Sequence, residues 1–358
     1  MTLPLVGIST GDPAGIGPEI TAKALALREI YDCCKPLVVC DFKVMDAALA
    51  FSRLQLKLNR IARPDEGRYQ LGTVDVLDMN NVDIAGLEYN KVSPITGKAS
   101  FDYVRKVIEL ALAQEIDATV TGPIHKEAIH AAGLDYAGHT EIFADLTKTR
   151  DYAMMLADGS FRVVHVSTHV SLQEAIRRVK TPRVLRVIQL ADEALKQLGL
   201  TTPRIAVAGL NPHCGENGLF GREEIDEICP ALAAARKLGI TVEGPIPSDT
   251  VFSRMKGGQF DIVVVMYHDQ GHIPMKFGGF CFDQKSNTWS SMAGVNVTLG
   301  LPIIRSSVDH GVAFDKGGQG RANPQSMIEA IKMAAQLTLC RKPLSRPPAR
   351  ALASSPTT

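Results

Sequence analysis

The chain has no long hydrophobic run and no excess charge of either sign. No apolar stretch approaches the roughly 18 to 20 residues of a membrane helix, and the first residues lack the charged start and long apolar core of a signal peptide. The 39 Lys and Arg residues nearly balance the 38 Asp and Glu residues. Strong attraction to nucleic acid or to anionic membrane is therefore not expected. We predict a cytoplasmic protein whose partner is a small molecule.

A paired cysteine motif is also missing. The seven cysteines include the neighbours Cys33 and Cys34 but contain no C-x-x-C spacing. This pattern provides neither a disulfide framework nor a zinc-thiolate site. Cys214 lies beside His213, and we expect it only to fill space there.

Short Val- and Ile-rich runs alternate with amphipathic stretches of helical length. This pattern is typical of a mostly parallel sheet covered by helices, so we predict an α/β fold. A length of 358 residues allows one large domain or two smaller ones. The expected strands cover 5–9, 37–40, 74–77, 118–121, 162–166, 205–208, 262–266 and 295–298, and the expected helices include 181–198 and 221–238.

Three histidines each follow an expected buried strand: His169, His213 and His268. Ligands of open α/β sheets bind beyond the carboxyl ends of strands. Imidazole is a common metal ligand, and three protein ligands leave positions open for a substrate. The pattern indicates one divalent metal ion, although each histidine alone could instead be satisfied by backbone at a strand end. His165, within its strand, and His272, on the following helix, are expected to be structural.

A second group of residues is typical of an anion site: His139, Thr140, Lys276, Asn296 and Arg305. Arginine offers a planar fork, lysine a point charge, and an apparent helix start at Gly138 free N–H groups. Surface lysines and arginines are often only solvated. Arg305, however, ends the apolar run GLPIIR, and a cation at a strand end is costly to leave unpaired.

A glycine-rich segment at 310–324 leads into an amphipathic helix. It contains no G-x-G-x-x-G, which argues against an ordinary Rossmann fingerprint. Its backbone could still wrap a nucleotide, with an aspartate accepting hydrogen bonds from ribose hydroxyls. A surface turn is the alternative. The cofactor-binding candidates are His310, Gly311, Asp315 and Asn323.

Six motifs, in this order, resemble the 4-hydroxythreonine-4-phosphate dehydrogenase family, which is related to the isocitrate and isopropylmalate dehydrogenases. They span nearly the whole chain apart from its last residues. They are STGDPAGIGPE (9–19), VTGPIHKEAI (120–129), GHTE (138–141), NPHCGENG (211–218), YHDQGHIPMK (267–276) and VNVTLGLPIIRSSVDHG (295–311).

The resemblance implies two α/β lobes with a cleft between them. The expected division is a cofactor-side lobe of 1–125 plus 285–342, a metal and dimerisation lobe of 126–284, and a disordered tail of 343–358. It also implies a homodimer whose active site lies at the subunit interface, so that some of these side chains serve the neighbouring subunit.

The resemblance further implies the residues of the site. His169, His213 and His268 fall on the family's metal positions, and the five anion-site residues fall on its substrate positions. The implied reaction is oxidation by NAD of a hydroxyl beta to a carboxylate, followed by loss of carbon dioxide. Asp315 would favour NAD over NADP, although Lys316 beside it weakens that inference. Asp249 and Asp269 are the candidate bases, and either could instead orient an imidazole.

The segment 277–294 departs from the family pattern. It is longer than expected for the vitamin B6 enzyme, contains the only tryptophan, Trp289, and resembles a sibling branch that oxidises D-threonate or D-erythronate 4-phosphate. The first prediction is 4-hydroxythreonine 4-phosphate, as in pyridoxal 5'-phosphate biosynthesis, and the sugar acids are the alternative. A metal-dependent phosphatase or lyase is the alternative from another class. The residues suit zinc, cobalt, manganese or magnesium.

Overall fold

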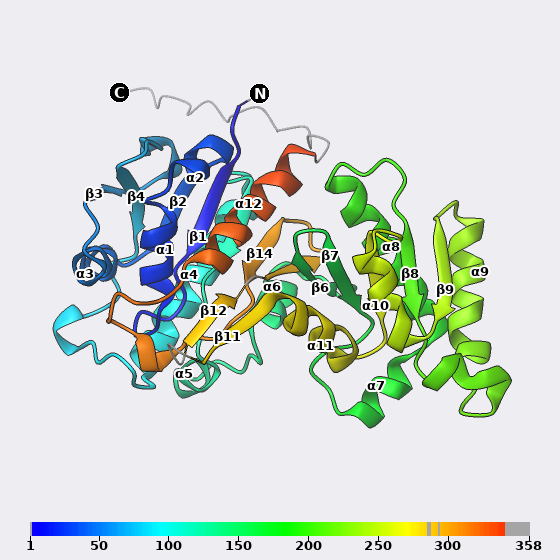
Figure 1. Ribbon diagram of the computed structural model, residues 1–358. Helices are drawn as coiled ribbons and strands as arrows, with labels where there is room; N and C mark the ends of the chain where they lie inside the picture. The colour runs from blue at the N-terminus through cyan, green and yellow to red at the C-terminus, as the bar shows by residue number, and fades with distance from the viewer. Residues whose placement is uncertain (1, 285–287, 293, 341–358) are drawn as a thin grey trace, which may run out of the picture.

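The computed structural model describes residues 2–284, 288–292 and 294–340. Within them a sheet of 12 strands has the order β3-β4-β2-β1-β5-β14-β13-β6-β7-β10-β8-β9, and β11 pairs with β12 separately. Figure 1 shows this sheet running through the molecule. The strands of the large sheet are β1 (Leu5–Ser9), β2 (Lys35–Cys40), β3 (Lys57–Ile61), β4 (Thr73–Asp78), β5 (Ala118–Thr121), β6 (Ala153–Asp158), β7 (Phe161–His165), β8 (Ile205–Ala208), β9 (Val242–Ile246), β10 (Ile262–Val265), β13 (Val295–Leu299) and β14 (Arg305–Val308).

Strand direction reverses at three successive junctions between the two halves of the sheet, so the two halves run in opposite directions. Strands β1, β5 and β14 run parallel, and so do β7, β10 and β8. Between these groups β13 is antiparallel to β14 and β6, and β6 is antiparallel to β7. The carboxyl ends of β7, β10 and β8 therefore lie at the edge of the sheet opposite to those of β1, β5 and β14.

Helices cover both faces of the sheet. One face carries α1 (Gly17–Ala24), α8 (Thr181–Gln197), α9 (Cys229–Lys237) and α12 (Gln325–Leu339). The other carries α4 (Pro94–Leu112), α6 (His139–Leu146), α10 (Ser248–Lys256) and α11 (His268–Gly279). Short helices α2 (Arg28–Cys33), α3 (Phe42–Ser52), α5 (Lys126–Ala131) and α7 (Leu172–Arg178) join these layers.

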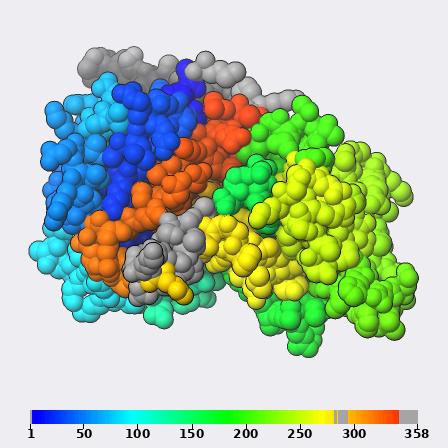
Figure 2. Space-filling view, viewed as in Figure 1, coloured from blue at the N-terminus to red at the C-terminus, as the bar shows by residue number. Residues whose placement is uncertain are grey.

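Alternation along the strands divides the core between the two faces. Val164 and Val264 belong to the larger apolar cluster on the α8 face, whereas Val163 and Val265 belong to the smaller cluster beneath α10. Successive side chains of a strand point to opposite faces, so each strand contributes to both layers. This explains why the strands read as continuous apolar runs. Figure 2 shows the blue N-terminal part and the green to yellow middle of the chain at opposite ends, with orange and yellow segments meeting between them.

The expected strands are all present within one or two residues. The expected helix 221–238 is shorter than predicted: residues 221–222 lie outside it, and a π-helical turn, Glu224–Ile228, precedes α9. The sequence predicted that Arg305 ends a strand, and this is wrong, because Arg305 begins β14. Antiparallel neighbours were hard to expect because Ala153–Asp158 and Val295–Leu299 are as apolar as the parallel strands.

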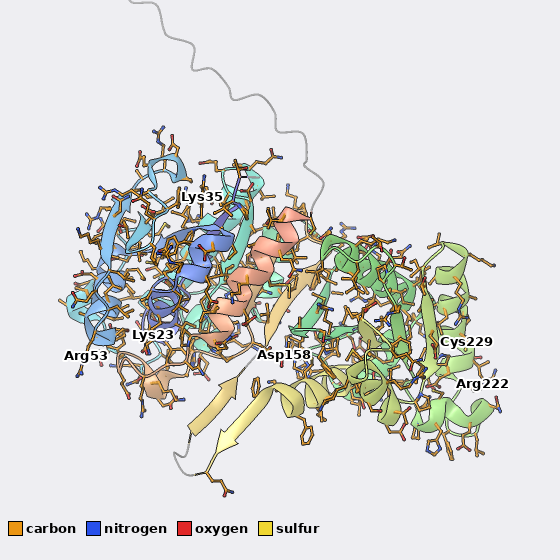
Figure 3. The ribbon with its side chains drawn as sticks, turned by 45° about the horizontal axis from the view of Figure 1, so that its top comes forward. Lys23, Lys35, Arg53, Asp158, Arg222 and Cys229 are labelled. Atoms are coloured by element: carbon orange, nitrogen blue, oxygen red, sulfur yellow. The ribbon has the colours of Figure 1, made fainter. Side chains whose placement is uncertain are left out.

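The lobes, the tail and segment 277–294 are the remaining features of the chain's organisation. One sheet extends through both expected lobes, so their division stays a prediction, and the tail 343–358 lies outside the described residues. In segment 277–294, β11 (Phe280–Asp283) and β12 (Thr288–Met292) form a hairpin that projects from the body (Figure 3), and the side chain of Trp289 lies outside the description. Among the described helices none has the length and apolar character to cross a membrane.

Candidate active site

Arg305 lies at the centre of the predicted anion site. Its side chain is 2% exposed, and its guanidinium donates to the hydroxyls of Thr298 (2.8 Å) and Thr121 (3.2 Å). The ring of Phe143 on α6 lies 5.4 Å from the guanidinium carbon. Burial lowers the pKa of Arg305 to about 10. The charge of Glu141 opposes this shift in part. The site therefore holds a buried cation that is hydrogen-bonded to neutral hydroxyls, an arrangement suited to binding an anion.

His139 faces the same region from α6. It begins this helix one turn before Phe143, so the two side chains lie on one side of the helix. Burial of the ring, and secondly the charge of Arg305, lower the pKa of His139 well below its usual value. A neutral imidazole at neutral pH follows, which can both donate and accept a hydrogen bond. Thr140 is the next residue of the same helix turn.

Asn296 completes the group on the sheet. It lies two residues from Thr298 on β13, so both side chains are on the face that Arg305 occupies. Each of three predicted substrate residues keeps one buried polar atom without a hydrogen-bond partner among the described residues: His139 Nε2, Asn296 Oδ1 and Arg305 Nε. Buried polar atoms are normally paired. Three unpaired atoms on one face are therefore evidence for a polar ligand.

Lys276, the fifth predicted substrate residue, lies on α11. Its side chain is exposed, with Nζ 5.6 Å from the centre of the Phe280 ring. Asp309, which the sequence did not indicate, follows β14. The charges of Lys276 and His268 act on this carboxyl to lower its pKa. Burial raises the pKa of this carboxyl to about 6. The signal that could have found Asp309 is its place in the SSVDHG motif, beside the cofactor candidate His310.

Two of the three predicted metal ligands come together. His169 follows β7 and His268 follows the neighbouring β10, and their ring centres are 5.7 Å apart. They line a hollow of about 470 Å³ together with Tyr267 and Asp269. His213 follows β8 at the same edge of the sheet but does not line this hollow. No group of three or more metal-binding side chains forms within the described part of this single chain.

Carboxylates orient two of these imidazoles. Nδ1 of His213 lies 2.7 Å from Glu216 Oε1, and Nδ1 of His268 lies 2.7 Å from Asp269 Oδ1. A carboxylate can only accept, so Nδ1–H donates and Nε2 keeps its lone pair. This is the arrangement that surrounds histidine ligands in metal proteins. The donor chemistry of His213 and His268 therefore fits a divalent metal ion.

His165 and His272 lie inside the fold, as expected. His165 ends β7 and its Nδ1–H donates to the carbonyl oxygen of Met154, while His272 lies on α11 and donates to that of His268. The ring of His272 stacks on that of His268 at 3.6 Å. Gly271 allows this packing, because a Cβ there would lie 2.5 Å from His165 Nε2.

The second candidate base lies in a different place. Asp249 lies on the surface in the first turn of α10, close enough to Cys214 to contribute to the pKa of that thiol. Burial, followed by the charges of Glu224, Cys229 and Asp249 in that order, raises the pKa of Cys214 to about 11. An inert thiol is consistent with the space-filling role expected for Cys214.

The glycine-rich segment covers the carboxyl ends of β1, β5 and β14. The carbonyl oxygen of Val312 accepts from Ile16 N–H, and Phe314 stacks on His125 with ring centres 4.6 Å apart. Asn323 Oδ1 accepts from Gln325 N–H at the start of α12, and Nδ1–H of His310 donates to Gly311. Asp315 lies in a short 3₁₀ turn, Phe314–Lys316.

An internal anchor, which the sequence reasoning missed, holds this segment. Glu19 on α1 is fully buried and accepts from the N–H groups of Gly320 (3.1 Å) and Ala322 (2.5 Å). Lys23 pairs with Glu19 (2.7 Å) and donates to the carbonyl oxygens of the same two residues. Figure 3 shows Lys23 between α1 and that segment. The motif at 9–19 therefore contributes a structural ion pair as well as a loop.

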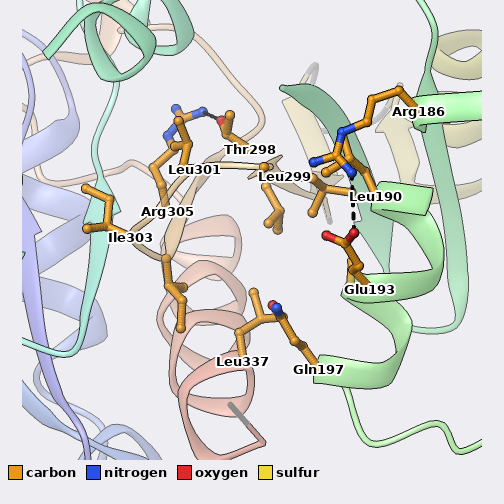
Figure 4. A pocket seen from close by; sticks show the side chains of 14 residues that line it. Arg186, Leu190, Glu193, Gln197, Thr298, Leu299, Leu301, Ile303, Arg305 and Leu337 are labelled. Atoms are coloured by element: carbon orange, nitrogen blue, oxygen red, sulfur yellow. Dashed lines mark hydrogen bonds and ion pairs between the residues drawn. The ribbon is translucent and has the colours of Figure 1, made fainter. Parts of the chain in front are cut away.

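A separate cavity of about 150 Å³ lies between α8, α12 and the β13–β14 turn (Figure 4). Arg186 and Glu193 pair in its wall at 3.3 Å. Among the predicted site residues only Arg305 contributes to its lining, and the Arg305 guanidinium is bound to Thr298. This cavity is distinct from the hollow beside His169.

Comparison with known proteins identifies the class. Over 94% of the chain, with a TM-score of 0.82 and 42% identity, the fold matches 99% of a 4-hydroxythreonine-4-phosphate dehydrogenase crystal structure from Klebsiella pneumoniae. A D-threonate 4-phosphate dehydrogenase of Cupriavidus necator is 45% identical over 95% of this chain and 98% of that protein. A protein of Symbiobacterium thermophilum named for the same activity is 48% identical over 94% of this chain and 97% of that protein. The fold is that of these dehydrogenases, and the chain is an enzyme of the oxidoreductase class.

The family follows from the same comparison. The family described as Pyridoxal phosphate biosynthetic protein PdxA matches residues 32–334, and the chain belongs to it. The α/β fold and the resemblance stated from the sequence motifs are thereby confirmed.

Proposed function

We propose that this dehydrogenase oxidises a 4-phosphorylated hydroxy acid with NAD and a divalent metal ion, and that its substrate is D-threonate 4-phosphate. The atoms of His139, Asn296 and Arg305 that have no partner among the described residues carry the proposal, because they support binding of a polar ligand where the motifs predict the substrate. Relatives named for D-threonate 4-phosphate, with 45% and 48% identity over most of the chain, support this sugar acid. The alternative is 4-hydroxythreonine 4-phosphate and a place in pyridoxal 5'-phosphate synthesis.

Binding of the phosphate is assigned to the buried cation and its neighbours. Arg305 Nε would donate to a phosphate oxygen, and neutral His139 would donate through Nε2–H or accept from a protonated oxygen. Lys276, exposed on α11, would add a second positive charge. Fixing the charged end of the substrate in this way orients the carbon that loses hydride.

The metal would be held by His169, His213 and His268. When bound, a divalent ion lowers the pKa of a substrate hydroxyl and stabilises negative charge on the oxygen during oxidation and decarboxylation. Asp269 orients His268, since its carboxylate is bound to Nδ1–H. The hydrogen bond from His268 also lowers the pKa of Asp269, which makes this carboxyl a weak base.

Two carboxylates remain as candidates for the proton acceptor. The sequence indicates Asp249 and Asp269, and the lowered pKa of Asp269 favours Asp249 of these two. Asp309 joins it because a pKa of about 6 suits proton transfer near neutral pH. An Asp309→Asn variant with an unchanged pH profile of kcat/KM would exclude Asp309.

A homodimer would complete the metal site. His213 stays apart from the hollow that His169 and His268 line, so a second copy is the natural source of the third ligand. Helix α11, which carries His268, also exposes the apolar side chains of Ile273 (66%) and Phe277 (91%). Exposed apolar groups one helical turn apart beside a predicted site are typical of a subunit interface.

The cofactor would bind at the glycine-rich segment. Asp315 would accept hydrogen bonds from the ribose hydroxyls and repel a 2'-phosphate. An Asp315→Ser variant should lose discrimination against NADP, measured as the ratio of kcat/KM values for the two cofactors. An unchanged ratio would remove Asp315 from this role.

One assay tests the whole proposal. NADH formation is followed with D-threonate 4-phosphate, D-erythronate 4-phosphate and 4-hydroxythreonine 4-phosphate, with added Zn²⁺, Mn²⁺, Co²⁺ or Mg²⁺. We expect the highest kcat/KM with D-threonate 4-phosphate and no turnover after chelation. Preference for the amino acid would establish the alternative substrate. Release of inorganic phosphate without NADH formation would instead identify the phosphatase alternative.

A further inference from the structure

The loop that carries His213 has an unusual backbone. His213, Cys214, Gly215, Glu216 and Asn217 all have positive φ, with values of 50°, 56°, 77°, 41° and 56°. L-residues other than glycine seldom adopt this conformation, and then mostly as single residues. Four non-glycine residues in one left-handed turn therefore need a compensating reason, either structural or functional.

Buried contacts hold this left-handed turn in place. Glu224 is 2% exposed, and its carboxylate accepts from the N–H groups of Leu210 and Asn211, both at 2.7 Å, and from the Asn211 amide at 2.9 Å. Asn211 O in turn accepts from Cys214 N–H at 3.1 Å. The backbone before the turn is thus fixed by a carboxylate that belongs to the π-helical turn Glu224–Ile228.

The turn brings two side chains together. His213 and Glu216 are three residues apart, and Nδ1 of the imidazole lies 2.7 Å from Oε1 of the carboxylate. The imidazole is 64% exposed and the carboxylate 46%. An exposed pair of this kind contributes little to folding stability. Stability alone therefore does not explain why four residues adopt the left-handed conformation around it.

We propose that Glu216 is a positioning residue that prepares His213 to bind metal. The carboxylate keeps the proton of His213 on Nδ1 and leaves the lone pair of Nε2 free to bind the metal. The left-handed turn supplies the geometry, and Glu224 holds that turn. This inference rests on the proposed metal-dependent function and extends it to a residue outside the three histidines.

Binding of Co²⁺ to the full-length protein tests the proposal. Its dissociation constant is measured from the visible absorption spectrum for the wild type, Glu216→Gln and Glu216→Ala. We expect about tenfold weaker binding for the glutamine variant and up to about a hundredfold for the alanine variant, the range seen when partners of histidine ligands are removed. The thermal unfolding midpoint of the metal-free protein should stay unchanged for Glu216→Gln.

Two matched variants complete the experiment. Asp226→Asn removes one negative charge from a surface ion pair with Arg222 (2.9 Å). Figure 3 shows Arg222 at the outer end of the molecule. This variant should bind Co²⁺ as the wild type does. His213→Ala should lose binding. If His213→Ala loses binding while both Glu216 variants keep wild-type affinity, the positioning role is wrong and the metal site stands. If His213→Ala binds Co²⁺ normally, the metal assignment fails, and this inference fails with it.

Discussion

Arg305 is a buried cation whose hydrogen bonds go to two neutral hydroxyl groups. Its pKa falls from 12.5 to about 10, which corresponds to about 3 kcal/mol of unfavourable free energy for the charged form in the folded protein. The folded state tolerates this at neutral pH because the rest of the core offsets it. A residue retained at such a cost is better explained by a ligand than by packing.

Replacing Arg305 by methionine should separate these roles. We expect Arg305→Met to raise the free energy of unfolding of the ligand-free protein by up to about 3 kcal/mol, measured by urea denaturation. It should also abolish the increase in stability that inorganic phosphate gives the wild type, which is about 2.7 kcal/mol at a hundred times Kd.

Arg183 is the matched control for this change. It is a partly buried arginine that donates to the carbonyl oxygens of Val166 and Tyr152, both at 2.9 Å. Arg183→Met leaves two acceptors unpaired and should destabilise the protein. If phosphate stabilises Arg305→Met as much as it stabilises the wild type, Arg305 does not bind the anion.

The left-handed turn at 213–217 is the element whose conformation the sequence signals least. Gly215 has φ of +77°, and a Cβ there would lie 2.8 Å from the carbonyl oxygen of Gly221 and 3.0 Å from Glu224 Oε2. Only glycine satisfies both the backbone and the space. The turn therefore depends on this position as well as on Glu224.

Gly215→Ala should destabilise the protein by more than the backbone strain alone, which is about 1 to 2 kcal/mol. Gly133→Ala is the control, because Gly133 has nearly the same φ, +78°, with nothing within 4 Å of the added Cβ. The difference between the two, from urea unfolding, measures the steric part. Equal effects would mean that the loop moves aside freely and that the turn is less fixed than its contacts indicate.

The anchor of the glycine-rich segment belongs to the same scale. Glu19→Gln removes the charge that binds the N–H groups of Gly320 and Ala322, so the segment should lose order. A hydrogen bond to a charged group contributes roughly 1.5 to 3 kcal/mol, so NAD should bind about ten- to a hundredfold more weakly. Calorimetric titration with NAD measures this. Glu29→Gln, which breaks an exposed pair with Lys332, is the control and should bind NAD normally. Unchanged NAD affinity in Glu19→Gln would place the cofactor elsewhere.

Across the whole molecule, buried histidines should make the metal-free protein sensitive to acid. Burial lowers the pKa of His165 to about 3 and that of His139 well below 6.5. In the unfolded chain both take up protons near pH 6.5, so the unfolded state binds more protons and stability falls as pH drops below that value. At pH 5 His165 alone should cost on the order of 2 kcal/mol relative to pH 7.5. Urea unfolding at both pH values checks this, and equal free energies would contradict it.

Assembly is the second property at this scale. Phe277→Asp places a charge on the most exposed apolar side chain of α11 and should convert a dimer into monomers with little loss of monomer stability. Light scattering coupled to gel filtration measures the mass. Leu112→Asp, at a 47% exposed position on α4, is the control and should stay dimeric. A wild type that is monomeric at micromolar concentration would remove the shared-site proposal.

The sequence by itself determined the α/β class, the strands and the family, because apolar period, strand length and motif order are local properties. It also indicated that His139, Asn296 and Arg305 belong together. It could not show that strand direction reverses through β13 and β6, since side-chain patterning does not distinguish parallel from antiparallel neighbours when both are buried.

Only the tertiary structure decided how the site residues are supported. Glu19, Glu216 and Asp309 act through contacts with distant residues or through an unusual backbone, and neither is visible in composition or spacing. His213 shows the limit of the strand-end argument. A shared sheet edge brings three strand ends into one neighbourhood, but the loop after each strand decides where the side chain points. Here His213 lies on a left-handed turn and does not line the hollow beside His169 and His268.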